Sequence, residues 1–91
     1  MKVKILFMGP LADFTGEKEV LIELPEGSTV GDLLKYVVKN YIPKLPKGLY
    51  VDGQFRMMLI LNQRDIHEQK DANRPLKDGN TLYLIPPIGG G

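Results

Sequence analysis

One amphipathic helix, predicted over residues 29–42, constrains the fold more than any other feature of the sequence. Thr29 is a favourable N-cap, and Asp32 follows three residues later, where a capping box places an acceptor. Pro43 prevents the helix from continuing. Apolar residues recur at the spacing of one helical face at Val30, Leu33, Leu34, Val37, Val38 and Tyr41. Because a predicted strand pair precedes the helix, this apolar face must be buried against a sheet.

Alternating apolar residues predict four strands, over 2–8, 19–24, 56–62 and 81–85. The residues predicted to face the core are Val3, Ile5, Phe7, Val20, Ile22, Leu24, Met57, Leu59, Leu61, Leu82 and Leu84. The connection between the first two strands is short, which predicts an antiparallel hairpin. The last strand follows a long excursion, so it can pair parallel to the first.

The segments between these strands give weaker signals. Residues 11–16 are predicted to form a short loop, with Phe14 packed back onto the core. Residues 43–54, which are rich in Pro and Gly, are predicted to form a surface loop. Residues 62–65 are predicted to form a turn, and 66–69 a short edge strand.

This order of elements predicts an α+β chain with the β-grasp, or ubiquitin-like, architecture: a mixed sheet of four to five strands with one main helix on one face. At 91 residues the chain is the size of one domain. We expect the β-grasp domain to span 1–88 and a flexible C-terminal glycine tail to span 89–91.

Composition excludes several classes of function. The chain has no cysteine, and therefore no disulfide, thiolate metal site or cysteine nucleophile. Its net charge of +1 gives no reason to expect nucleic acid or an anionic membrane as a partner. His67, the single histidine, lies in a polar run and is expected at the surface, so no metal is predicted. No apolar run of signal-peptide or membrane length follows Met1, which favours a cytoplasmic protein.

The outward-pointing residues of three predicted strands are also apolar. They are Leu6, Met8, Met58, Ile60, Tyr83 and Ile85. If these strands are neighbours, the six residues form one patch on the face of the sheet opposite the helix. Single apolar residues are common on surfaces, whereas clustered patches mark interfaces. We therefore predict a partner-binding face beside the end of the last strand.

The C-terminal segment carries the strongest functional signal. Pro86 and Pro87 follow the last strand and prevent both helix and sheet from continuing. Ile88 and three glycines, Gly89, Gly90 and Gly91, come next, and such a tail can extend into a narrow channel. A frayed terminus is the plainer explanation, but the tail continues directly from a strand. We predict that chemistry occurs at the Gly91 carboxylate, next to Gly90, and that Pro86, Pro87, Ile88 and Gly89 contact a partner.

These residues resemble the MoaD/ThiS family of ubiquitin-like sulfur carriers, most closely its molybdopterin-synthase small subunits. The resemblance is carried by 77–80, by the last strand and by the Ile-Pro-Pro-Ile run before the glycines. Residues 11–16, 29–34 and 61–63 also match in place. The family usually ends in two glycines, so either Gly91 is the working terminus or one glycine is trimmed first.

The resemblance implies a mechanism in which partners supply the catalytic groups. An adenylyltransferase related to ubiquitin-activating enzymes (the MoeB/ThiF type) uses ATP to adenylate the terminal carboxylate. A sulfur donor then displaces AMP and leaves a thiocarboxylate on Gly91. In the molybdopterin branch, the tail enters the large subunit of molybdopterin synthase and gives up its sulfur there. The chain itself is then a non-catalytic subunit that binds no cofactor permanently.

Alternatives from other classes remain open at this point. A protein modifier would join its activated terminus to a lysine, as in archaeal relatives that share the tail. Thiamine and tRNA thiolation pathways also use this fold and tail, although the paired prolines favour the molybdopterin branch. A plain binding module would use the apolar face and leave the tail inert.

Overall fold

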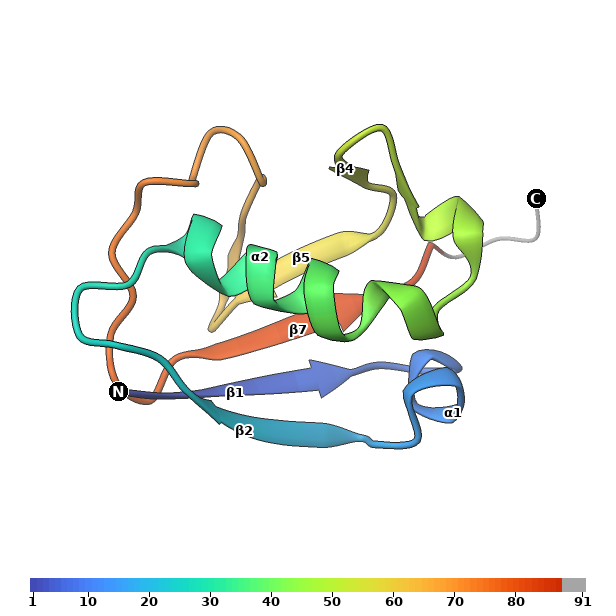
Figure 1. Cartoon of the computed structure of the whole chain (residues 1–91), viewed down its shortest axis with the longest axis horizontal. Coiled ribbons are helices and arrows are strands. Elements are labelled where there is room, and N and C mark those ends of the chain that lie inside the picture. The colour runs from blue at the N-terminus through green and yellow to red at the C-terminus, as the bar shows by residue number, and fades with distance from the viewer. Residues whose placement is uncertain (88–91) are drawn as a thin grey trace.

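The computed structural model describes residues 1–87, which form a five-stranded mixed sheet with one main helix across one face (Figure 1). The strand order is β2-β1-β7-β5-β6. The elements of this layer pair are β1 (Lys2–Phe7), β2 (Glu19–Glu23), α2 (Val30–Asn40), β5 (Met58–Leu61), β6 (Arg64–Asp65) and β7 (Thr81–Ile85). The predicted β-grasp architecture is confirmed.

Strand pairing agrees with the directions expected from connection lengths. β1 and β2 form an antiparallel hairpin in which Lys4 lies opposite Leu21. β7 pairs parallel to β1, with Leu6 opposite Tyr83, and antiparallel to β5, with Ile60 opposite Tyr83. Because β1 and β7 are central and parallel, both end at the same edge of the sheet.

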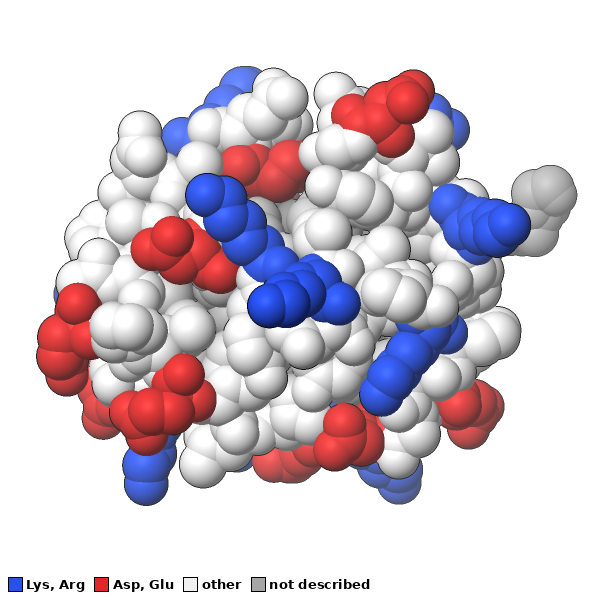
Figure 2. Space-filling view, in the orientation of Figure 1, with Lys and Arg blue, Asp and Glu red and all other residues white. Residues whose placement is uncertain are grey.

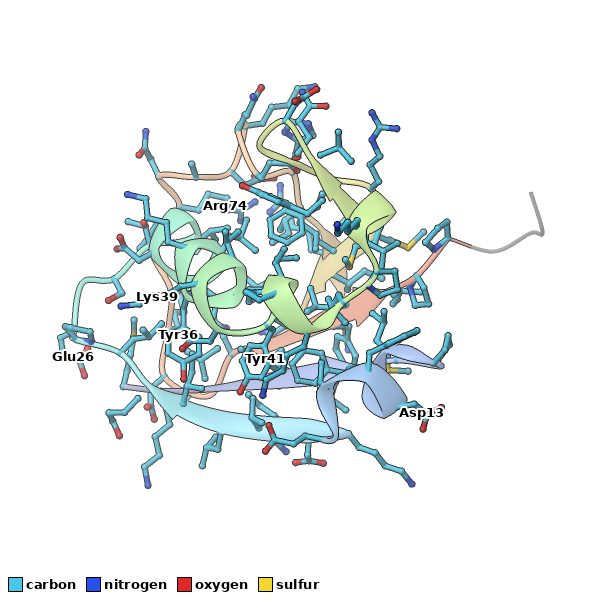
Figure 3. All side chains as sticks on the ribbon, turned by 45° about the vertical axis from the view of Figure 1, so that its right-hand side comes forward. Asp13, Glu26, Tyr36, Lys39, Tyr41 and Arg74 are labelled. Carbon is cyan, nitrogen blue, oxygen red and sulfur yellow. The ribbon has the colours of Figure 1, made fainter. Side chains whose placement is uncertain are left out.

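The core lies between the sheet and α2. Val3, Ile5, Leu82 and Leu84 are fully buried from the sheet side, as period-two alternation predicts. Val30, Leu33, Leu34 and Val37 meet them from α2. Tyr41 packs against Phe7 at one end of the core, with ring centroids 4.8 Å apart. Figure 3 shows Tyr36 and Tyr41 between α2 and β2.

The start of α2 confirms the predicted capping box. The Asp32 backbone N–H donates to Thr29 Oγ1 at 3.3 Å, and the Thr29 N–H donates to Asp32 Oδ2 at 2.8 Å. Two further N–H groups of the first turn are satisfied from a distant segment, because Val30 donates to the Arg74 carbonyl and Gly31 to that of Ala72. The helix is therefore fixed at its N-terminus both by its own cap and by residues 72–74.

The predicted loop over 11–16 is wrong, because Leu11–Thr15 forms a short helix, α1, that ends at Gly16 with φ 80°. The expectation that Phe14 packs onto the core is also wrong, since the residue is 52% exposed. One turn of helix puts positions four apart on the same side. Leu11 and Thr15 are accordingly the buried residues, and Phe14 faces outward.

The segment predicted as a surface loop contains regular structure. It begins with two 3-10 turns, η1 (Ile42–Lys44) and η2 (Lys47–Leu49), and continues into a two-stranded ribbon of β3 (Tyr50–Val51) and β4 (Gln54–Phe55). The Asp52-Gly53 turn that joins them has φ of 53° and 77°. Asp-Gly favours this type of hairpin turn, so the ribbon had a sequence signal that the loop prediction missed.

The predicted edge strand is displaced by two residues. β6 is Arg64–Asp65 rather than 66–69, and it pairs with β5 across a two-residue turn. Asn62 occupies the left-handed region there, with φ 58°, which Asn tolerates better than most residues. The turn predicted over 62–65 is thus confined to Asn62 and Gln63.

Candidate docking face and tail exit

The structure brings the six predicted outward residues together on the sheet face opposite α2. In the sheet register, Leu6, Tyr83 and Ile60 form one row across β1, β7 and β5. Met58 and Ile85 form the next row. Met8 follows directly after β1 and stays next to β7, because its N–H donates to the Leu84 carbonyl at 3.0 Å. We call Leu6, Met8, Met58, Ile60, Tyr83 and Ile85 the outer patch.

The outer patch exposes large apolar side chains in spite of this packing. Met58 is 52% exposed and Met8 38%, while the other four residues are half-buried. Along β2, Glu19 lies opposite Leu6 and pairs with Lys4 at 3.5 Å. On the far side, Asp65 lies opposite Ile60. An apolar centre with a charged rim is the usual anatomy of a protein–protein interface.

Leu21 is a further exposed apolar residue on this face that was left out of the predicted patch. The residue is 62% exposed, the highest value among the large hydrophobic residues of the described chain. It lies beyond the pair of Lys4 and Glu19, which separates it from the outer patch. The alternation of β2 already pointed Leu21 outward, but its distance from β7 followed only from the strand order.

The end of β7 opens into an apolar hollow of about 500 Å³. Met58 and Ile85 of the outer patch line it together with Arg56, Met57, Pro86 and Pro87. The hollow therefore continues the outer patch up to the last described residues. Arg56 and the hollow itself had not been predicted, because strand alternation places residues on faces but does not show where a strand end leaves space.

A second, smaller hollow lies on the β1 side of Pro86. It measures about 240 Å³ and is lined by Leu6, Phe7, Met8, Gly9, Ala12 and Lys18. Gly9 has φ 55°, and a Cβ there would lie 3.7 Å from Pro86 Cγ. One hollow therefore lies on each side of Pro86, and each is lined by two residues of the outer patch and by one cation, Lys18 or Arg56.

The predicted tail residues fall partly outside the described chain. Pro86 is half-buried and Pro87 exposed at the edge of the sheet where β1 and β7 both end. Ile88, Gly89, Gly90 and Gly91 lie outside the described residues, so their role stays a prediction. What the structure does establish is that β7, one of the two central strands, leads directly to them.

Two carboxyl groups with lowered pKa values, those of Asp32 and Asp71, belong to segments on the helix side of the sheet. Hydrogen bonds from the Thr29 backbone and side chain lower the pKa of Asp32, and the His67 backbone N–H and Arg74 lower that of Asp71. His67 is exposed, as predicted, and its Nδ1 accepts from the N–H groups of Gln69 and Lys70. Within residues 1–87, no three His, Cys, Asp or Glu side chains are grouped as metal ligands. The exposed apolar side chains of the outer patch make it a surface suited to binding.

None of the helices in residues 1–87 combines the length and apolar character needed to cross a bilayer. The longest, α2, has 11 residues, about half of what a span requires.

Known proteins share both the sequence pattern and this fold. A molybdopterin synthase sulfur carrier subunit from Chlamydomonas reinhardtii is 30% identical over 92 residues, covering 100% of both chains. Small archaeal modifier protein 3 from Haloferax volcanii is 25% identical over 93 residues, again with 100% of both covered. The solved complex of subunits 1 and 2 of molybdopterin-converting factor from Helicobacter pylori contains a chain 27% identical, with a TM-score of 0.67 and 100% of both chains covered.

The family model described as the ThiS family matches residues 5–91, which include the second half of β1, the other strands of the sheet, α2, the outer patch and the glycines. This agrees with the resemblance carried by the C-terminal sequence. The chain belongs to the ThiS/MoaD family of ubiquitin-like sulfur carriers.

Proposed function

We propose that this chain carries sulfur on its C-terminal glycine for molybdopterin biosynthesis. The observation that carries the proposal is the course of β7, which passes from the core through the outer patch to Pro86 and Pro87. A partner docked on the outer patch would receive the tail directly. The relative from C. reinhardtii, named as the sulfur carrier subunit of molybdopterin synthase, supports this branch of the family.

The chemistry begins at the Gly91 carboxylate, which is a poor electrophile because its oxygen is a poor leaving group. An E1-like activating enzyme lets this carboxylate attack the α-phosphorus of ATP, and pyrophosphate leaves. A sulfide-level donor then attacks the acyl carbon, AMP leaves, and a thiocarboxylate remains. In the acceptor enzyme, the thiocarboxylate sulfur attacks a carbon of the pterin precursor and displaces an oxygen leaving group from it. Water then hydrolyses the acyl–sulfur bond, which leaves the sulfur on the precursor and restores the carboxylate.

The chain contributes reach and docking to these steps, and its partners contribute the catalytic groups. We propose that the large subunit of molybdopterin synthase covers the outer patch, as two subunits associate in the H. pylori complex. We also propose that Arg56 and Lys18, at the mouths of the two hollows, favour partners with acidic groups around the tail channel. Because activation consumes ATP, we place the process in the cytoplasm.

The test is an intact-mass measurement after incubation with ATP, a sulfide source and the activating enzyme from the same cell. We expect a gain equal to the exchange of one oxygen for one sulfur, located by fragmentation on the last residue. Deleting Gly90 and Gly91 should abolish the gain while leaving the unfolding free energy unchanged, because the deletion lies outside the described fold. A chain lacking only Gly91 shows whether Gly90 can serve as the terminus. No gain with a competent enzyme, either in the full chain or in the chain lacking Gly91, would refute the carrier proposal.

Conjugation to protein lysines is the second candidate, and the H. volcanii relative named as a modifier protein favours it. It shares the activation step but ends in an isopeptide bond. Conjugates of the affinity-tagged chain purified from cells would then yield branched peptides. A protease that cleaves the tail just before its last two glycines would leave a Gly-Gly remnant on the modified lysine. Their absence under several growth conditions, with thiocarboxylate present, would leave sulfur transfer alone.

A further inference from the structure

A groove on the opposite side of the molecule, away from the outer patch, is not used by the proposed function. It measures about 340 Å³ and lies between α2, the β3–β4 ribbon and residues 68–72. Its apolar lining comes from Leu34, Val38, Tyr50, Phe55 and Ala72. We call it the helix-side groove. A hollow of this size accommodates one large apolar side chain with its flanking backbone.

The walls of the helix-side groove are tied together by hydrogen bonds. The Gly31 N–H donates to the Ala72 carbonyl at 2.8 Å, which fixes residues 68–72 to the first turn of α2. Phe55 N–H donates to Glu68 Oε1 at 3.1 Å, which fixes the ribbon to the same segment. Tyr50 and Phe55 stack edge to face, with centroids 4.9 Å apart. The groove is therefore formed before any ligand arrives, which lowers the entropic cost of binding.

Gly31 shows how closely this wall approaches the helix. A Cβ at this position would lie 3.0 Å from the Ala72 carbonyl oxygen, closer than most Cβ contacts, so a side chain here would displace residue 72 by a few tenths of an ångström. The glycine therefore permits the hydrogen bond that closes the end of the groove. The same contact explains why residues 68–72 follow the helix surface.

The rim of the helix-side groove is positively charged along α2. Lys35 and Lys39, four residues apart on one helical face, line the groove and are exposed. Neither lies within 4.0 Å of a carboxylate oxygen in the described chain, where the ion pairs involve Met1, Lys4 and Arg74. Figure 2 shows basic side chains across the surface of α2, and Figure 3 shows Lys39 at that surface. Glu68, the acidic residue of the lining, is engaged by the Phe55 N–H.

We propose that the helix-side groove binds a segment of a partner protein that combines a large apolar side chain with neighbouring carboxylates. The apolar side chain would fill the groove between Val38 and Tyr50, and the carboxylates would pair with Lys35 and Lys39. Because α2 covers one face of the sheet (Figure 1) and the outer patch lies on the other, one partner can hold the chain at the helix-side groove while another receives its tail. This inference goes beyond sulfur transfer and does not depend on it.

A second copy of this chain is a weaker occupant. Its β2 does present Leu21 between Glu19 and Glu23. Both carboxylates are already engaged, however, Glu19 by Lys4 at 3.5 Å and Glu23 by the Met1 amino group at 2.8 Å. Such a contact would also be head-to-tail and would continue into filaments unless the rotation closed a ring. Charge complementarity therefore favours a different protein.

The test titrates the isotope-labelled full chain with the peptide acetyl-Ser-Glu-Glu-Leu-Phe-Glu-Glu-Leu-Ser-amide and follows backbone amide shifts. We expect saturable shifts at Gly31, Gly53 and Ala72. Replacing each Glu of the peptide by Gln should weaken binding roughly fivefold, the effect of two exposed ion pairs. Replacing Leu and Phe by Ser should abolish the shifts.

Matched charge reversals distinguish specific pairing at the rim of the helix-side groove from a general effect of net charge. The double variant Lys35→Glu with Lys39→Glu should weaken binding of the acidic peptide. The loss of affinity should be at least as large as the loss caused by replacing each Glu of the peptide by Gln. Lys47→Glu with Lys77→Glu makes the same change in net charge away from the helix-side groove and should keep wild-type affinity. Equal loss in both variants, shifts centred on the outer patch, or no saturable shift with any peptide would overturn the proposal. Concentration-dependent shifts without peptide would instead indicate a second copy. None of these readouts requires ATP or the glycines, so they fail independently of sulfur transfer.

Discussion

The two faces of the sheet are made from the same kinds of residue but are covered differently. On β7, Leu82 and Leu84 are fully buried beneath α2, while Tyr83 and Ile85 alternate with them and remain half-buried on the outer patch. Burial stabilises the fold only where another element supplies contacts. The inner face therefore contributes folding free energy, and the outer face holds apolar area that can contribute to binding.

The largest expected effect follows from breaking the covered face. Leu84→Ala removes a fully buried side chain, and such changes lower the free energy of unfolding by about 2–5 kcal/mol. A domain this small has little stability in reserve, since native domains retain only about 5–15 kcal/mol. Urea denaturation followed by circular dichroism measures the loss.

The adjacent residue supplies the control for this comparison. Ile85→Ala truncates a half-buried side chain on the outer patch and should cost about 1 kcal/mol, near the average for point substitutions. If Leu84→Ala and Ile85→Ala were equally destabilising, the outer face would have to be a second core surface, and its assignment to binding would be wrong.

The next effect concerns the uncovered face and appears in binding rather than folding. Met58→Asp places a charge within the outer patch, opposite Ile85 and beside the hollow at Pro86. We expect it to weaken binding to the large subunit of molybdopterin synthase by roughly thirtyfold, the size of an interface hot spot. Isothermal titration calorimetry with the two purified proteins measures the change.

Leu21→Asp is the matched control on the same face. Leu21 is more exposed than Met58, at 62% against 52%, but lies beyond the Lys4–Glu19 pair. Leu21→Asp should weaken binding to the large subunit less than about threefold, as expected for a position at the rim of an interface. An equal loss in the two variants would show that general surface charge, rather than the outer patch, controls docking.

The parts of this comparison that could be predicted from sequence are those that depend on periodicity. A strand buried on one side must alternate, so Leu82, Leu84, Tyr83 and Ile85 were placed on the correct faces before the strand order was known. The capping box at Thr29 is equally local, because both of its hydrogen bonds join residues three apart.

What the sequence did not predict depends on contacts between distant segments. α1 is too short for periodicity to reveal, and its orientation follows from Leu11 entering the core. β6 is defined by its pairing with β5, so its bounds could not be read from 64–69 alone. The helix-side groove requires α2, the β3–β4 ribbon and residues 68–72 to meet, and neither the ribbon nor that meeting was predicted. The two hollows at Pro86 likewise arise where separate strands end.

The smallest expected effect concerns the acid sensitivity of the segments that cover the inner face of the sheet. Hydrogen bonds hold the pKa values of Asp32 and Asp71 below the ordinary value of 3.8, and both residues belong to segments on the helix side. A carboxylate whose pKa is lower in the folded state stabilises that state above pH 3.8 and loses this contribution as the pH falls through the folded value. Asp32→Asn with Asp71→Asn should therefore make the urea midpoint fall less steeply with acid below about pH 4. Asp13→Asn, which removes an exposed carboxylate from α1, is the control for loss of charge alone. If the double variant kept the wild-type pH dependence, the capping box at Thr29 and the turn at His67 would not stabilise the segments over the inner face. Apolar packing alone would then hold these segments on the sheet.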